Sequence, residues 1–194
     1  MILIQLLLKL KRHIVYKRYA NQFANFGRDS MIKAPIRIIG AKHINIGQSV
    51  SILDGARIEA IESWGTSKYT PEILIDNGCE IGQGFHLTAV NKVLIHKNVL
   101  IAPYVYITDV EHDYKDVMQS IKNQSLSYSE TEIGEDSWIG IGVRILEGVH
   151  IGKHCIIGAN SVVTKDIPEN CVAVGIPARV VKKYNRITDE WEKI

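Results

Sequence analysis

The sequence lacks the cysteine pattern of a disulfide framework or a structural zinc site. Cys79, Cys155 and Cys171 are the only cysteines in the 194-residue chain, and no two of them form a CxxC pair. An odd, widely spaced set of this kind is typical of a protein that keeps its thiols reduced. We therefore expect a cytoplasmic setting and no metal site.

Long apolar runs and a strong charge of one sign are also missing. No apolar run reaches the roughly 18 residues that a membrane-spanning helix needs, and no small-residue cleavage site follows the apolar N-terminus. The net charge is +2 and the pI is about 8.4, without a basic stripe interleaved with aromatic residues. This composition is typical of an ordinary soluble protein and does not favour nucleic-acid binding.

Acidic residues are absent from residues 1–20, MILIQLLLKLKRHIVYKRYA, where leucines recur at helical spacing among lysines and arginines. The segment predicts a basic amphipathic helix, and we assign it to an N-terminal unit of residues 1–26. Two interpretations stay open. The helix lies on an anionic membrane surface, which would make the protein peripheral at the inner membrane, or its leucine stripe packs on the main domain or a neighbouring subunit.

The rest of the chain is dominated by a repeat of six residues. Aliphatic side chains recur at this interval, small residues lie two positions before most of them, and glycine often follows. A period of six fits neither an α-helix nor simple strand alternation, and instead predicts short strands separated by corners, wound into stacked coils. Cys79 and Cys155 occupy the small position, so we interpret them as packing residues. The longest run is Ile133, Ile139, Ile145, Ile151, Ile157 and Val163, with shorter runs from Ile32 to Ile107.

Tandem repeats such as IGEDSWIGIGVRILEGVHIGKHCIIGANSVV resemble the hexapeptide-repeat acetyltransferases, which include the galactoside, maltose and serine acetyltransferases. The resemblance implies an all-β solenoid, a left-handed parallel β-helix, assembled as a homotrimer with active sites between subunits. It covers roughly residues 30–183. We therefore expect the β-helix over residues 27–167 with an extruded loop at 108–130, and a short cofactor-end tail or helix over 168–194.

The repeat is interrupted around one histidine. After Ile107 the next aliphatic in the pattern is Ile133, so residues 108–130 leave the coils as a long polar loop that contains His112. Long loops in compact domains are usually functional or disordered. Transfer of an acyl group to a hydroxyl needs a base that can take the hydroxyl proton, and an imidazole is suited to this. Asp109 could orient the ring, as could a backbone carbonyl.

His112 also has simpler interpretations: a surface histidine in an acidic loop, or a metal ligand, for which no second histidine or cysteine lies nearby. The resemblance favours catalysis, because ITDVEH is similar to the family segment whose histidine is the base. Many relatives have glycine after that histidine, whereas this chain has Asp113.

The C-terminal part, GANSVVTKDIPENCVAVGIPARVVKKY, ends in a basic cluster that by itself could be a solvated terminus. It resembles the acetyl-CoA-binding end of the family. The resemblance implies that the pantetheine arm runs along corner residues and that cations face the nucleotide phosphates. The residues assigned in this way are Trp138, Gly140, Ile141, Ala159 and Thr164 along the arm, and Lys165, Arg179 and Lys182 at the phosphates.

The acceptor site is harder to predict. His86 aligns with an acceptor-contacting position in the galactoside enzymes, Asn91 lies at the following corner, and Tyr104 and Tyr114 could stack on a sugar ring. The coils together with the tail KKYNRITDEW resemble the O-acetyltransferases of O-antigen and capsule gene clusters, which implies a lipopolysaccharide or capsular acceptor. Alternatives are an N-acetyltransferase of an amino sugar nucleotide, a serine acetyltransferase lacking its helical domain, and a non-catalytic or metal-binding β-helix.

Overall fold

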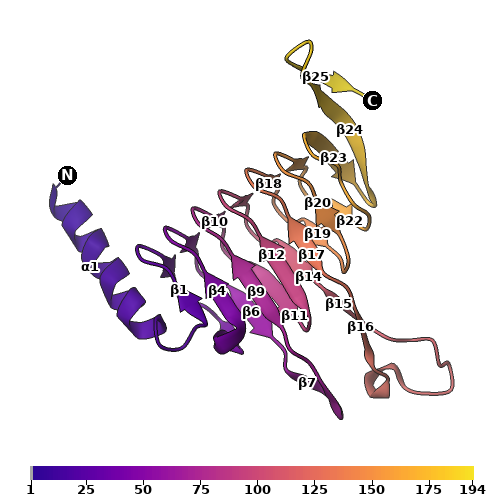
Figure 1. The fold of residues 1–194 in the computed structure, drawn as a ribbon, viewed down its shortest axis with the longest axis horizontal. Coiled ribbons are helices and arrows are strands. Elements are labelled where there is room, and N and C mark those ends of the chain that lie inside the picture. The colour runs from indigo at the N-terminus through magenta and orange to yellow at the C-terminus, as the bar shows by residue number, and fades with distance from the viewer. Residues whose placement is uncertain (1) are drawn as a thin grey trace.

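The computed structural model describes residues 2–194, with the side chains of residues 2–9 and 11 left aside. The chain winds into stacked triangular coils whose sides form three parallel sheets, which we call sheets A, B and C (Figure 1). Sheet A contains β1 (Asn25–Phe26), β4 (Ile44–Ile46), β9 (Glu72–Ile75), β12 (Lys92–Ile95), β17 (Thr131–Ile133) and β20 (His150–Ile151).

Sheets B and C form the other two sides of each coil. In sheet B lie β2 (Met31–Ile32), β5 (Ser51–Ile52), β10 (Glu80–Ile81), β13 (Leu100–Ile101), β18 (Trp138–Ile139), β21 (Ile156–Ile157) and β23 (Cys171–Gly175). In sheet C lie β3 (Arg37–Ile39), β6 (Arg57–Ala60), β11 (His86–Ala89), β14 (Tyr106–Thr108), β19 (Arg144–Ile145) and β22 (Val162–Val163).

The six-residue repeat fills the interior, as the sequence predicts. In sheet B the ladder runs Ile81, Ile101, Ile139, Ile157 in register, and the equivalent ladders of the other sheets are also aliphatic. These side chains are almost completely buried, which makes the coil interior one continuous apolar column. Cys79 and Cys155 lie inside this column, as predicted.

The two ends of the chain differ from expectation in detail. Helix α1 (Ile2–Tyr19) ends well before residue 26, because β1 already pairs with β4 and the rings of Tyr19, Phe23 and Phe26 pack together. At the other end the tail, for which the sequence left tail and helix open, is extended: β24 (Ala178–Asn185) and β25 (Glu190–Lys193) continue sheet B as antiparallel strands beyond β23. They pair with backbone that the last coil would otherwise leave exposed.

The extruded segment is an ordered arm and not an irregular loop. Strands β15 (Val110–His112) and β16 (Leu126–Tyr128) pair antiparallel, and the short helix η2 (Ile121–Asn123) lies near its tip. The buried Gln124 side chain closes the tip with hydrogen bonds to the backbone of Asp116 and Gln119. We call residues 110–128 the arm.

A second, shorter hairpin leaves the coils where the sequence pattern shows only a slip of phase between Ile58 and Ile75. It consists of β7 (Ser63–Trp64) and β8 (Ser67–Lys68), and a short helix η1 (Ala41–His43) precedes β4. The hairpin and the arm project from the same side of the stack (Figure 1). They enclose the outer face of sheet C between them, because Trp64 from the hairpin touches His112 from the arm.

Candidate active site

A groove of about 390 Å³ lies on the outer face of sheet C. Its floor includes His86 from β11 and Tyr106 from β14, and its walls are Trp64 from the hairpin and His112 from the arm. The floor residues stand in register on neighbouring strands, each one position before an inward aliphatic residue. The coil repeat therefore determines the floor, whereas the two insertions supply the walls.

His112 lies in strand β15, opposite Leu126, and its side chain is exposed to the groove. Its ring packs edge-on against Trp64, with 4.8 Å between ring centroids and an interplanar angle of 63°. Among residues 2–194 no hydrogen bond holds the imidazole, so an aromatic contact positions it. Sequence reasoning found His112 but missed Trp64, whose only signal was the phase slip beside it.

Asp109 does not orient His112, which corrects the sequence-based expectation. Its buried carboxylate accepts the backbone N–H groups of Val90 at 2.9 Å and Asn91 at 2.8 Å. Burial raises the pKa of Asp109, and these hydrogen bonds oppose that rise. Asp109 is the bend residue between β14 and β15, and its carboxylate points to the corner at Val90 and Asn91. Asp109 therefore fastens the foot of the arm to the coil below.

A second acidic group lies at the foot of the arm. Burial raises the pKa of Glu147, and the nearby carboxylates of Glu111 and Asp109 raise it further. The side chain of Ser127, which pairs with Glu111 across the arm, opposes this. The foot of the arm is therefore a carboxylate-rich region, and one of its carboxylates, Glu111, also lines the groove.

The cationic part of the groove floor surrounds one buried carboxylate, Glu59, whose side chain is 5% exposed. Arg57 Nε donates to Glu59 Oε2 at 2.7 Å, and Arg37 Nε lies 3.1 Å from Oε1. His86 Nε2 is 3.6 Å from Oε2 and 3.2 Å from Thr88 Oγ1. Burial lowers the pKa of His86, and the charge of Arg57 adds to this effect. Sequence reasoning missed both arginines and Glu59, although Arg57 and Glu59 flank the inward Ile58 and Arg37 is in register with Arg57 on β3.

The residues assigned to the cofactor arm lie mainly at the corner between sheets B and C. Ile141 and Ala159 are exposed neighbours there, since the Asn160 N–H donates to the Ile141 carbonyl at 2.8 Å. Neither the Ile141 nor the Ala159 N–H has a hydrogen-bond partner in the described chain. A side chain at Gly140 would place Cβ 2.7 Å from the Ile157 carbonyl oxygen, so glycine is required by the close coil packing.

The remaining cofactor candidates are spread over the C-terminal end. Trp138 lies on β18 and is half-exposed. Thr164 and Lys165 are exposed at the corner between sheets C and A, whereas Arg179 and Lys182 are exposed on β24. A single chain therefore does not gather them into one cavity; they share only the same end of the stack.

Of the acceptor candidates, only His86 lines the groove with His112. The backbone N–H of Asn91 is held by Asp109. Tyr104 is exposed at the corner between sheets B and C, against Gly84, and Tyr114 is exposed on the arm. The structure does not bring these three side chains into the groove of one chain.

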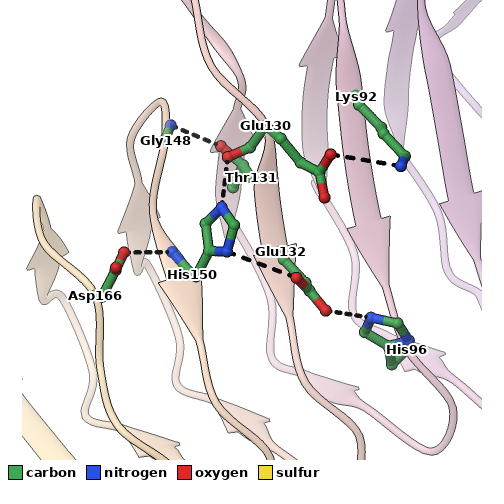
Figure 2. A network of polar contacts seen from close by, with 8 residues as sticks. All are labelled: Lys92, His96, Glu130, Thr131, Glu132, Gly148, His150 and Asp166. Carbon is green, nitrogen blue, oxygen red and sulfur yellow. Dashed lines mark hydrogen bonds and ion pairs between the residues drawn. The ribbon is translucent and has the colours of Figure 1, made fainter.

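A second network of histidines and carboxylates covers the outer face of sheet A (Figure 2). His96 Nε2 is 2.6 Å from Glu132 Oε1, and His150 Nδ1 is 3.6 Å from Glu132 Oε2. Asp166 accepts the His150 backbone N–H at 2.8 Å. The His96 and His150 side chains are 35% and 49% exposed, and both pair with Glu132. Within residues 2–194 no group of three or more His, Cys, Asp or Glu side chains is arranged to hold a metal ion.

The cysteines offer no nucleophile. All three are buried and free, and burial raises the pKa of both Cys79 and Cys155 to about 11. A thiol with so high a pKa is protonated at neutral pH and reacts slowly. This agrees with their interpretation as packing residues.

None of the helices in the part of the chain that the structure describes is both long and apolar enough to cross a membrane. Among the described side chains of α1, those at its end pack on the coils: Val15 and Tyr16 contact the core and Tyr19 is buried, whereas Leu10 and Ile14 are more than half exposed.

The chain is similar in sequence to proteins of a known family. The family model "Bacterial transferase hexapeptide (six repeats)" matches residues 130–165. The chain is 34% identical over 170 residues to the putative lipopolysaccharide biosynthesis O-acetyl transferase WbbJ of Escherichia coli, covering 84% of this chain and 83% of that protein.

Two solved structures share the architecture. A galactoside acetyltransferase in complex with coenzyme A superposes with a TM-score of 0.55 at 25% identity, covering 92% of this chain and 81% of that one. The Bacillus cereus N-acyltransferase AntD superposes with a TM-score of 0.72 at 16% identity, covering 89% of each chain, and shows the fold alone. The coils are thus a left-handed parallel β-helix, and the chain belongs to the hexapeptide-repeat acetyltransferases.

Proposed function

We propose that the protein is an acetyl-CoA-dependent O-acetyltransferase that acetylates a sugar hydroxyl of a bacterial surface polysaccharide, such as O-antigen or capsule, or of its precursor. The observation that carries this proposal is the position of His112, which projects into the groove and is held by Trp64. The similarity to WbbJ supports the O-linked, lipopolysaccharide-directed reaction.

The corner between sheets B and C fits the co-substrate. The unpaired N–H groups of Ile141 and Ala159 can donate to the amide carbonyls of a pantetheine arm, and the missing Cβ of Gly140 keeps the coils close there. Lys165, Arg179 and Lys182 supply exposed cations for phosphates at the same end. Acetyl-CoA would supply the acetyl group as an activated thioester.

The proposed chemistry is direct transfer within a ternary complex. His112 takes the proton of the acceptor hydroxyl as its oxygen bonds to the acetyl carbonyl carbon. The backbone N–H of Ile141 donates a hydrogen bond to the carbonyl oxygen as negative charge develops there. When the carbon–sulfur bond breaks, the protonated His112 returns its proton to the departing thiolate. The buried, protonated cysteines leave no group for a covalent acetyl-enzyme.

We further propose that the site is completed in a homotrimer. Ile141 lies at the corner where strands of sheet C begin, whereas the arm leaves sheet C at the corner where β14 ends. An active site that uses both would take His112 from one subunit and the Ile141 corner from its neighbour. Sedimentation should then give a trimer. The exposed Leu10 and Ile14 fit either subunit packing or peripheral contact with an anionic membrane, which vesicle flotation would separate.

The test is acetyl transfer from labelled acetyl-CoA to a panel of glycans and sugar nucleotides, followed by mass spectrometry. His112→Ala should lower kcat about 10²- to 10⁴-fold with CoA binding retained. The control variant His96→Ala, in the sheet A network, should have the kcat of the wild type. Near-normal turnover of His112→Ala would show that His112 is not the general base. Transfer to an amine in preference to a hydroxyl would replace O-acetylation by N-acetylation of an amino sugar.

A further inference from the structure

One feature of the groove is not needed for proton transfer: two arginines share a single buried carboxylate. Arg37 and Arg57 are aligned in register on β3 and β6, and the next strands continue this row with His86 and Tyr106. All four residues line the groove that contains His112. The row is therefore part of the surface on which an acceptor would lie.

The hydrogen bond of Arg57 and the ion pair of Arg37 with Glu59 leave donors unused. Each arginine uses its Nε on Glu59, at 2.7 Å for Arg57 and 3.1 Å for Arg37. No hydrogen bond within residues 2–194 engages the terminal Nη atoms of either side chain. Both side chains are about half exposed, 58% for Arg37 and 47% for Arg57, so these donors are accessible.

The charge of the cluster is also unbalanced. One arginine would suffice to neutralise Glu59, and the second leaves a surplus positive charge on the floor. His86 adds little to it at neutral pH, because burial and Arg57 lower the pKa of His86. Glu111, the other carboxylate lining the groove, is on the arm and is exposed. The floor therefore favours an anionic ligand.

Guanidinium groups recognise phosphate through paired N–H donors in a planar fork. Two adjacent forks can serve more oxygens than one carboxylate offers, which favours a phosphoryl group over a carboxylated sugar. Glu59 contributes by holding both arginines in place through their Nε atoms. A neutral sugar would leave this surplus charge and these donors without partners.

We propose that the acceptor is a phosphorylated saccharide, with its phosphate or diphosphate bound by Arg37 and Arg57 and its hydroxyl presented to His112. The proposal rests on the acetyltransferase function proposed above and names the substrate class of that site. Arg37 and Arg57 are then determinants of acceptor specificity. The same chemistry would serve a nucleotide-linked sugar and a lipid diphosphate-linked sugar.

Binding can be tested without turnover. Isothermal titration of the wild type with inorganic pyrophosphate and with uridine diphosphate should give saturable binding. Arg37→Gln should weaken it about 10- to 100-fold, the usual effect of a lost hydrogen bond to a charged group. Arg28→Gln, an exposed arginine outside the groove, is the matched control and should bind like the wild type. Arg57 still pairs Glu59 in the Arg37 variant, and a thermal melt checks that it is folded.

Steady-state kinetics then distinguish the proposed phosphate binding from the proposed acetyl transfer on which it rests. The kcat/KM for a sugar 1-phosphate should exceed that for the matching methyl glycoside, and Arg37→Gln should abolish the difference mainly through KM. Comparing a nucleoside diphosphate sugar with a short polyprenyl diphosphate sugar as acceptors then shows whether the sugar is carried by a nucleotide or by a lipid. Equal kcat/KM for charged and neutral acceptors would overturn the proposal that Arg37 and Arg57 bind the acceptor phosphate, while leaving acetyl transfer intact. Equal pyrophosphate affinity of Arg37→Gln and wild type would have the same consequence. Failure of transfer with pyrophosphate binding intact would instead overturn the function.

Discussion

The outer faces of sheets C and A each place a glutamate between basic side chains, yet the two clusters differ in environment. On sheet C, Glu59 is buried between Arg37 and Arg57 under two insertions. On sheet A, Glu132 is one-third exposed between His96 and His150 (Figure 2). The same coil repeat builds both rows by register, and each row lines a hollow, of about 390 Å³ on sheet C and about 420 Å³ on sheet A. The difference lies in the walls: the hairpin and the arm add Trp64 and His112 to the sheet C groove, and neither insertion lines the sheet A hollow.

The largest effect should come from replacing each of the two glutamates, Glu59 and Glu132, by glutamine in separate variants. Glu59→Gln should lower the free energy of unfolding by about 1–3 kcal/mol, because it removes the charge that accepts a hydrogen bond from Arg57 and pairs with Arg37. The loss stays below that of a fully buried pair because the arginines can hydrate. Glu132→Gln should cost about 0.2–1 kcal/mol, as for an exposed pair. Urea denaturation of both variants measures this, and equal losses would remove the distinction between the two faces.

A smaller effect should separate two tryptophans that contact histidines. Trp64 packs on His112 at 4.8 Å, whereas Trp191 stacks on His154 at 6.5 Å near the C-terminus. Trp64→Ala should lower kcat about 2- to 10-fold, since an edge-to-face pair contributes about 0.5–1.5 kcal/mol to holding the ring. Trp191→Ala should leave kcat unchanged. Steady-state kinetics with saturating acetyl-CoA compare the two, and equal kcat values would mean that Trp64 does not position the base.

The smallest effect should appear in the pH dependence of stability. Burial lowers the pKa of His86 from its ordinary value of 6.5, and Arg57 adds to this. A histidine with a lower pKa in the folded chain takes up a proton on unfolding, so stability should fall as the pH drops below about 6.5. His86→Gln should flatten this part of the curve, as measured by thermal melts between pH 7 and pH 5. Parallel wild-type and variant curves would show that His86 is not desolvated.

Much of the fold could be predicted from the sequence because the interior is periodic. Each aliphatic residue of the six-residue repeat meets its equivalent one coil away, so the pattern alone predicts ladders such as Ile81, Ile101 and Ile139. The form of the C-terminal tail was left open between tail and helix, and the open edge of sheet B decides it by binding β24 and β25. A local pattern does not report the pairing needs of a distant edge.

The site was only partly predictable for the same reason. His112 stands out because it lies in the long interruption of the repeat. Trp64, Arg37 and Glu59 do not, because they lie in short or regular segments whose importance depends on what covers them. Asp109 was assigned to His112 by proximity along the chain, but the chain bends at Asp109, whose carboxylate accepts the backbone N–H groups of the corner at Val90 and Asn91.

By itself, the sequence determined the coil, its apolar interior and the place where a histidine leaves it, because those properties repeat or break at intervals that can be counted along the chain. Only the tertiary structure decided what surrounds that histidine. The arm and the hairpin start at corners far apart in the sequence, and their meeting over sheet C depends on the stacking of the coils between them. That stacking also brings Arg37, Arg57 and His86 from three successive coils into one row.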